Sequence, residues 1–251
     1  MRYGDGDAGC RFTGVVSVGS AVTVGQSLSS LRALQMCRLR KSCQPAHPSL
    51  LGCAPMLTPA PPAPPPYGSV ALSAALKEHT RAVHDGLDQH LLQQRIFASR
   101  QRYLGFLRVQ WHFHDTIAPL YRMSDPGSTR LPLIEEDLRD LGAIMPVPHT
   151  WRPQPHAFSK ATALGWRYVA EGSTLGAAVL LKMAAALQLH AGYGARHLQP
   201  SSLGVAEYWR RERKVLDGVV LTAEERAQAC VAASDAFQFI RRCVDEEFRF
   251  E

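Results

Sequence analysis

The chain has 251 residues, of which 46% are apolar, and a formal net charge of +6. A chain of this length can bury one good-sized core, or one domain together with an extension. Residues 1–66 contain six Lys or Arg and two Asp or Glu, a net charge of +4, so residues 67–251 carry only +2. The basic charge therefore belongs mostly to the N-terminal segment, which argues against nucleic-acid binding by the rest of the chain.

Residues 1–66 are predicted to be a disordered N-terminal extension. They hold four of the six cysteines, namely Cys10, Cys37, Cys43 and Cys53. The proline-rich run at 59–66 favours an extended, solvated linker, so we place the domain boundary near Tyr67. Two alternatives stay open. Residues 27–43 resemble an organellar transit peptide, being rich in Ser and Arg without acids, and the segment is not part of the working protein if synthesis starts at Met56.

The compartment is predicted from the absence of familiar targeting and redox signals. No typical secretory signal is recognised at the N-terminus, and the cysteines show neither a CxxC spacing nor the spacing of a zinc site. The long apolar segment at 161–190 carries charges and glycines, as expected of a globular core. We therefore expect a soluble, cytoplasmic protein with reduced thiols and no membrane association.

From Val70 onward the pattern of apolar residues is helical, with short Pro- and Gly-containing breaks. Six helices are predicted, at residues 70–93, 99–122, 131–141, 161–190, 203–216 and 222–249. The alternation typical of strands is missing, and no internal repeat is found. The predicted fold class is therefore all-α, with a single helical domain at residues 67–251.

The segment at 161–190 is predicted to be a long, largely buried helix because no proline interrupts it and its charges are few. Helical geometry places Gly165, Gly172 and Gly176 on one face. Each glycine costs about 1 kcal/mol relative to alanine in a helix interior, so a close approach by a helix or a flat ligand is expected to offset that cost. Ser173 and Thr174 follow Gly172, and Gly/Ser clusters are common where helices bend.

The first predicted helix carries a histidine at the edge of its apolar stripe. The stripe consists of Leu76, Thr80, Val83, Leu87 and Leu91. His84 lies on its rim, where an imidazole can reach the core, and Asp88 follows four residues later, where its carboxylate can orient the ring. Together with the glycine face, these residues suggest a planar metallated ring held between two helices.

Two sequence motifs resemble the heme oxygenase family. They are LKEHTRAVH at 76–84 with LD at 87–88, and YVAEGSTLGAAVLLK at 168–182. The closest resemblance is to bacterial biliverdin-producing enzymes, including those that supply bacterial phytochromes. It implies an all-helical domain with heme between a proximal and a distal helix. Heme would be both cofactor and substrate, and O₂ with electrons from an external donor would convert it to biliverdin, CO and ferrous iron.

The resemblance also assigns roles to individual residues. His84 stands at the position of the axial iron ligand, and Asp88 at that of a carboxylate that orients it. Gly172 and Gly176 correspond to the distal glycines that let the backbone approach the heme. Ser173 stands where the animal enzymes have an aspartate that organises the proton-delivering water. The resemblance therefore leaves the residues of the proton path unassigned.

Further residues are assigned to the edge of the heme. Lys77, Tyr168 and, on weaker grounds, Lys182 correspond to positions that contact the heme propionates. Phe237 either packs on the heme or belongs to the core, and core packing is favoured. Arg167 and Glu171 are interpreted mainly as a surface ion pair, with a contribution to the proton path as the alternative.

The same resemblance implies protein partners, and rival functions stay open beside it. A ferredoxin or a flavoprotein reductase would supply electrons, and a bacterial phytochrome is a candidate receiver of biliverdin. The cationic stretch at 209–214 is interpreted as a solvated face, with docking of an acidic donor as the alternative. His112 and His114 face different sides of a helix, so they are not expected to share a metal.

Two other functional classes remain possible on the same scaffold. The first is a protein that binds or buffers heme without degrading it. The second is the chemistry of thiaminase-like relatives, which needs an inward-facing nucleophile or carboxylate pair in a pocket. We disfavour the second because no cysteine lies near the glycine-rich segment in the sequence.

Overall fold

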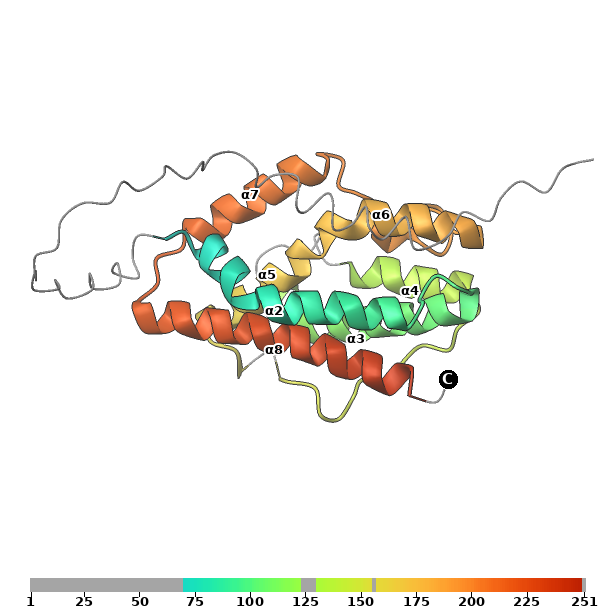
Figure 1. The fold of residues 1–251 in the computed structure, drawn as a ribbon, viewed down its shortest axis with the longest axis horizontal. Helices are drawn as coiled ribbons and strands as arrows, with labels where there is room; N and C mark the ends of the chain where they lie inside the picture. The colour runs from blue at the N-terminus through green and yellow to red at the C-terminus, as the bar shows by residue number, and fades with distance from the viewer. Residues whose placement is uncertain (1–69, 123–129, 155–156, 250–251) are drawn as a thin grey trace, which may run out of the picture. The chain divides into compact units, whose positions relative to one another are not determined.

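The computed structural model describes residues 70–122, 130–154 and 157–249. Its α-helices are α2 (Leu72–Gln93), α3 (Arg100–Arg122), α4 (Leu131–Asp140), α5 (Lys160–Gly172), α6 (Thr174–Ala184), α7 (Val205–Asp217) and α8 (Ala223–Glu247), with 3-10 turns η2 (Ala185–Leu187) and η3 (Arg196–Leu198) (Figure 1). Within these residues the only β-pairing consists of two isolated bridges, from His190 to Tyr193 and to Gly194, so the all-α prediction is confirmed. The predicted extension at 1–66 and the boundary at Tyr67 lie outside the described residues.

Apart from the glycine-rich segment, the predicted helices agree with the observed ones to within two residues at each end. Local capping explains several of these ends. α8 begins with a capping box, in which the Thr222 hydroxyl accepts from the backbone N–H of Glu225 and the Glu225 carboxylate accepts from that of Thr222. The N-cap of α5 is Ser159, whose hydroxyl accepts from the backbone N–H of Thr162.

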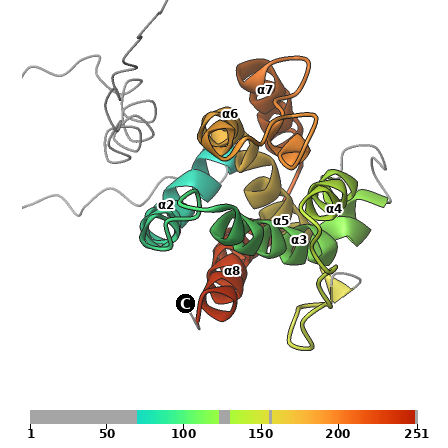
Figure 2. The same cartoon turned by 90° about the vertical axis from the view of Figure 1, so that its right-hand side faces the viewer.

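The core is built around α8, which packs against α5, α2 and α3. Both views show α8 running beneath α2 and α3, with α6 on the opposite side of α2 (Figures 1 and 2). Among the described glycines, the closest approach of a neighbour is at Gly165, where an added Cβ would stand 2.3 Å from the carbonyl oxygen of Ala229 on α8. This glycine therefore serves the packing of one helix on another.

The glycine-rich segment does not form the single helix predicted for residues 161–190. It bends at Ser173 into α5 and α6, and its helical part ends at Leu187, before Gln188 with a φ of 60°. The Ser173 hydroxyl donates to the carbonyl oxygen of Ala170 and the Thr174 hydroxyl to that of Glu171, at 2.7 Å each. Such side-chain bonds compete with the helical ladder and favour a bend at this point.

Among the described residues, Lys160–Leu187 is the one stretch whose length and composition would suit a membrane span, with a mean hydropathy of 1.3. The bend at Ser173 and the packing of α5 on α8 favour a core segment instead.

Candidate functional site

The site is organised by a contact between α2 and α5. The hydroxyl of Tyr168 on α5 lies within hydrogen-bonding reach of Thr80 on α2, and burial raises the pKa of Tyr168. One helical turn further along, α2 carries His84 and α5 carries Gly172. Residues four apart share a helix face, so His84 and Gly172 lie on the sides of the two helices that meet at this contact.

His84 combines an accessible ring with a defined orientation. Its side chain is 37% exposed, and its Nδ1 lies 3.4 Å from Oδ2 of Asp88, as the i,i+4 spacing predicts. The ring also meets Phe237 of α8 edge-to-face, with the ring centroids 5.3 Å apart. Burial raises the pKa of Asp88, while the neighbouring imidazole opposes that rise. Because Nδ1 faces a carboxylate, Nε2 is the nitrogen left to bind a ligand.

The other two glycines predicted to share a face with Gly165 lie in open surroundings. A Cβ added at Gly176 would meet no atom of another residue within 4 Å, and one at Gly172 would meet only the tip of the Trp209 ring, at 3.9 Å. The apolar helix α6 is also incompletely covered, since Leu175 is 44% exposed. α6 therefore presents bare backbone and apolar side chains to an accessible space.

The predicted propionate contacts are only partly brought together. Lys77 is exposed and lies two turns before His84 on the same face of α2, close to the contact with Tyr168. Lys182 is also exposed, but it lies on α6 about 9 Å along the axis from Gly176. No contact within the described residues joins Lys182 to the group around His84.

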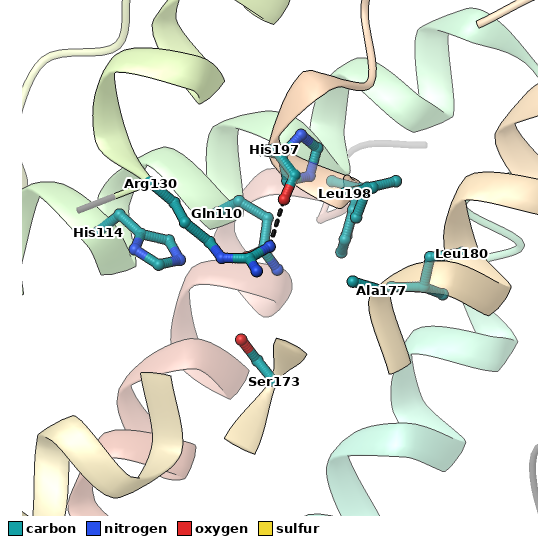
Figure 3. A pocket seen from close by; sticks show the side chains of 9 residues that line it. Gln110, His114, Arg130, Ser173, Ala177, Leu180, His197 and Leu198 are labelled. Atoms are coloured by element: carbon teal, nitrogen blue, oxygen red, sulfur yellow. Dashed lines mark hydrogen bonds between the residues drawn. The ribbon is translucent and has the colours of Figure 1, made fainter. Parts of the chain in front are cut away.

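A cavity of about 40 Å³ lies beside the bend at Ser173. It is lined by Phe106, Gln110, His114, Arg130, Ser173, Ala177, Leu180, His197 and Leu198. Figure 3 shows the Ser173 hydroxyl on the side of the Arg130 guanidinium, which donates a hydrogen bond to the carbonyl oxygen of His197. Ser173 itself is exposed, so it borders both the solvent-accessible side of the segment and the cavity.

Two histidines of this cavity carry buried nitrogens without a partner among the described residues, namely Nδ1 of His114 and Nε2 of His197. Nδ1 of His197 lies 2.8 Å from Oδ2 of Asp137, a carboxylate that can only accept, so the ring proton is on Nδ1 and Nε2 is an acceptor. Burial lowers the pKa of both histidines, that of His114 to about 3, and keeps both rings neutral near pH 7.

Glu171 is not the surface residue that the sequence suggested. It is 4% exposed, and its carboxylate accepts hydrogen bonds from the hydroxyls of Tyr121, at 2.6 Å, and Tyr208. Arg167 pairs instead with Glu212 of α7, at 3.2 Å. Desolvation lowers the pKa of Arg130 and the charge of Glu171 opposes this, so the buried carboxylate offsets the cation that lines the cavity.

Two further expectations concern metals and thiols. Within the described residues, no group of three or more His, Cys, Asp or Glu could hold a metal ion. Cys230 of α8, distant in sequence, does lie within electrostatic reach of Tyr168 on α5. Burial raises the pKa of its thiol, which makes it a weak nucleophile and still disfavours thiaminase-like chemistry.

Comparison with known proteins identifies relatives that cover most of the helical region. The chain is 40% identical over 167 residues to heme oxygenase PigA of Pseudomonas aeruginosa, covering 63% of this chain and 83% of that protein. It is 32% identical over 120 residues to a heme oxygenase of Xanthomonas campestris, covering 48% of this chain and 70% of that protein.

Solved structures give the same result. The NO- and CO-bound heme oxygenase from Neisseria meningitidis superposes with a TM-score of 0.65 at 33% identity, covering 73% of this chain and 94% of that one. Heme oxygenase from Leptospira interrogans, at 18% identity and a TM-score of 0.56, shares the fold and covers 70% of this chain and all of that one. The family model for heme oxygenase matches residues 70–246, and the chain accordingly belongs to the heme oxygenase family of oxidoreductases.

Proposed function

We propose that the helical domain binds heme through Nε2 of His84 and opens the macrocycle to biliverdin, releasing CO and ferrous iron. One observation carries this proposal: α6 presents the bare backbone of Gly176 to open space, immediately beyond the contact of α5 with the helix that carries His84. Heme is the substrate, and it also supplies the iron at which O₂ reacts. The protein holds this substrate and controls access to it.

The residues around the contact suit a flat, largely apolar ring with two carboxylates. The imidazole of His84 is an iron ligand of the usual kind, and Asp88 orients it. The backbone at Gly172 and Gly176, which carries no side chains, can lie close to the heme face opposite His84. It can thereby restrict which edge of the heme is open to attack. Lys77 and Tyr168 can pair with the propionates, with Lys182 as a weaker candidate, which would fix the rotation of the ring in its plane.

Proton delivery is assigned to the cavity beside Ser173. A space of about 40 Å³ can hold a water molecule, and the buried ring nitrogens of His114 and His197 need such a partner. The Arg130 guanidinium supplies donors there, while Nε2 of His197 accepts. Ser173 can then pass a proton between the cavity and the open side of α6. This arrangement would replace the aspartate that the animal enzymes have at the serine position.

The test of the binding site is a titration with hemin. The wild type should develop a Soret band, and His84→Ala should lose it or show it greatly weakened. His79→Ala is the matched control, because His79 is an exposed histidine on the same helix. An unchanged Soret band in His84→Ala would refute the assignment of the ligand.

A second measurement distinguishes an enzyme from a heme-binding protein. Only an enzyme will accumulate the blue-green tetrapyrrole when O₂ and ascorbate are added to the heme complex. A stable Soret band under these conditions would favour the alternative of heme buffering. We further propose a cytoplasmic reaction that uses a ferredoxin or flavoprotein reductase and passes biliverdin to a bacterial phytochrome. Covalent loading of an added apo-phytochrome would test the last step.

The proton path has a test of its own. Arg130→Gln should keep the Soret band but produce less biliverdin for each equivalent of reductant consumed, because reduced oxygen escapes without reaching the ring. Equal yields in Arg130→Gln and wild type would exclude the Arg130 side chain from proton delivery.

A further inference from the structure

Glu171 is a carboxylate buried between three helices. It lies in the last turn of α5, and only 4% of the residue is exposed. The hydroxyl of Tyr121 on α3 donates a hydrogen bond to its Oε1 at 2.6 Å, and the hydroxyl of Tyr208 on α7 donates one to its Oε2. Because an ionised carboxylate can only accept hydrogen bonds, two hydroxyl donors suit an anion at this position.

Two guanidinium groups complete the surroundings of this carboxylate. Arg130, at the start of α4, and Arg167, on α5, both lie within electrostatic reach of Glu171. Arg167 is also paired with Glu212 of α7, at 3.2 Å. Since the pair of Arg167 and Glu212 is neutral as a whole, Glu171 and Arg130 form a second pair of opposite charges in a place with little solvent.

Arg130 connects this buried charge with the cavity beside the bend. Its guanidinium lines the cavity together with Ser173, whereas the Glu171 side chain does not (Figure 3). Glu171 nevertheless belongs to the bend, because its carbonyl oxygen accepts a hydrogen bond from the Thr174 hydroxyl at 2.7 Å. Its carboxylate is therefore close to the cavity without touching its contents, and burial keeps solvent from screening the charge.

The sign of this charge bears on proton transfer. Arg130 places a positive charge at the wall of the cavity to which we assign the proton path, and a cation disfavours any further positive charge nearby. The carboxylate of Glu171 opposes this effect, because an anion favours the protonated form of the groups around it. Without the anion, water and hydroxyl groups beside Ser173 would be poorer at taking up protons from solvent.

We propose that Glu171 is a positioning residue of the proton path, a fixed negative charge that acts through Arg130 and raises the proton affinity of the distal cavity. The proposal rests on the function given above. Glu171 keeps its charge throughout, and no bond to it forms or breaks. Its affected groups include the water on the distal side of the heme. The charged and titratable groups that face Glu171 are Tyr121 of α3, Arg130, Arg167 of α5, Tyr208 of α7 and, beside Arg167, Glu212.

The test is a pH titration of the ferric heme complex of the full-length protein, followed by the change in its absorption spectrum as the distal water loses a proton. Glu171→Gln removes the charge, while the amide can still form hydrogen bonds with both tyrosines. The pKa of the distal water should fall by at least about 0.5 pH unit, which is about threefold in its acid dissociation constant. Arg130→Gln removes the opposite charge and should raise the same pKa.

Two matched variants separate the charge from a purely structural role in joining the three helices. Tyr208→Phe removes a hydrogen bond of Glu171 but keeps its charge. Glu212→Gln removes a carboxylate that is paired with Arg167. Both should shift the pKa of the distal water by less than half as much as Glu171→Gln does. No shift in Glu171→Gln, or a shift of the same size in Tyr208→Phe, would overturn the proposal.

The outcome for Glu171 is distinguishable from the outcome for the proposed function. A hemin complex that forms no biliverdin would refute turnover alone, because the titration needs none. If the wild type forms no hemin complex, the proposed function fails by itself, and urea unfolding of Glu171→Gln, Arg130→Gln and the double variant then tests the charge pair without heme. The double variant should lose less stability than the two single losses added together, and additive losses would refute the proposal.

Discussion

Gly165 and Gly176 lie on the same apolar segment in opposite surroundings, so alanine substitutions there should change stability in opposite directions. A Cβ at Gly165 would lie 2.3 Å from the carbonyl oxygen of Ala229 and 2.8 Å from the backbone nitrogen of Ala233. Because these are backbone atoms of α8, relief requires a shift of a whole helix, and we expect Gly165→Ala to cost about 1–3 kcal/mol or more. Gly176→Ala meets no atom within 4 Å and should gain up to about 1 kcal/mol in helix propensity.

Thermal unfolding without heme measures both effects. For a domain of this size 1 kcal/mol corresponds to about 2–4 °C, so Gly176→Ala should raise the Tm by up to about 4 °C and Gly165→Ala should lower it by several degrees. The two variants should rank in the opposite order when their affinity for heme is measured. The new methyl group at position 176 occupies the proposed heme face, so the Soret titration should show weaker binding, while folded Gly165→Ala should bind normally. A lower Tm for Gly176→Ala, or an unaltered affinity for hemin, would refute the assignment of an open face to α6.

Two further predictions concern buried polar groups. Asp137 is fully buried and accepts hydrogen bonds from Arg196 and His197. Asp137→Asn should therefore lower the unfolding free energy, measured by urea denaturation, by about 3 kcal/mol. A change below about 1 kcal/mol would show that the carboxylate is dispensable for stability. Burial lowers the pKa of His114 from 6.5 to about 3. Between these values the unfolded chain binds a proton that the folded chain excludes, so stability falls as the pH falls, by about 1.4 kcal/mol per pH unit. In His114→Gln this slope should be smaller by that amount, and an unchanged slope would assign the acid sensitivity to other groups.

Local sequence signals were sufficient to predict most of the helices. Helix periodicity and the proline- and glycine-containing breaks depend on neighbours within a few positions, which the sequence displays directly. The i,i+4 relation of His84 and Asp88 is of the same kind, and the two side chains do meet. The fold was predictable for this reason, whereas the roles of the site residues stay predictions.

Long-range contacts explain what the sequence did not reveal. Glu171 resembles a surface residue beside Arg167, but its surroundings come from Tyr121 on α3 and Tyr208 on α7, fifty and thirty-seven positions away. The three glycines are equivalent by helical periodicity, and only the position of α8 distinguishes Gly165 from the others. The cavity likewise joins α3, the start of α4, the bend and η3, and no local pattern could have marked it.

The bend at Ser173 connects the two halves of the proposed mechanism. A straight helix would continue the packing of Gly165 on α8 to the glycines that follow, and it would bury the face that they leave bare. By turning the chain between Gly172 and Thr174, the bend separates a packed half, α5, from an open half, α6. The same turn sets Ser173 at the wall of the cavity. Room for a ring on one side and a polar route on the other therefore have a common structural cause, and a variant that straightens the segment should lose both together.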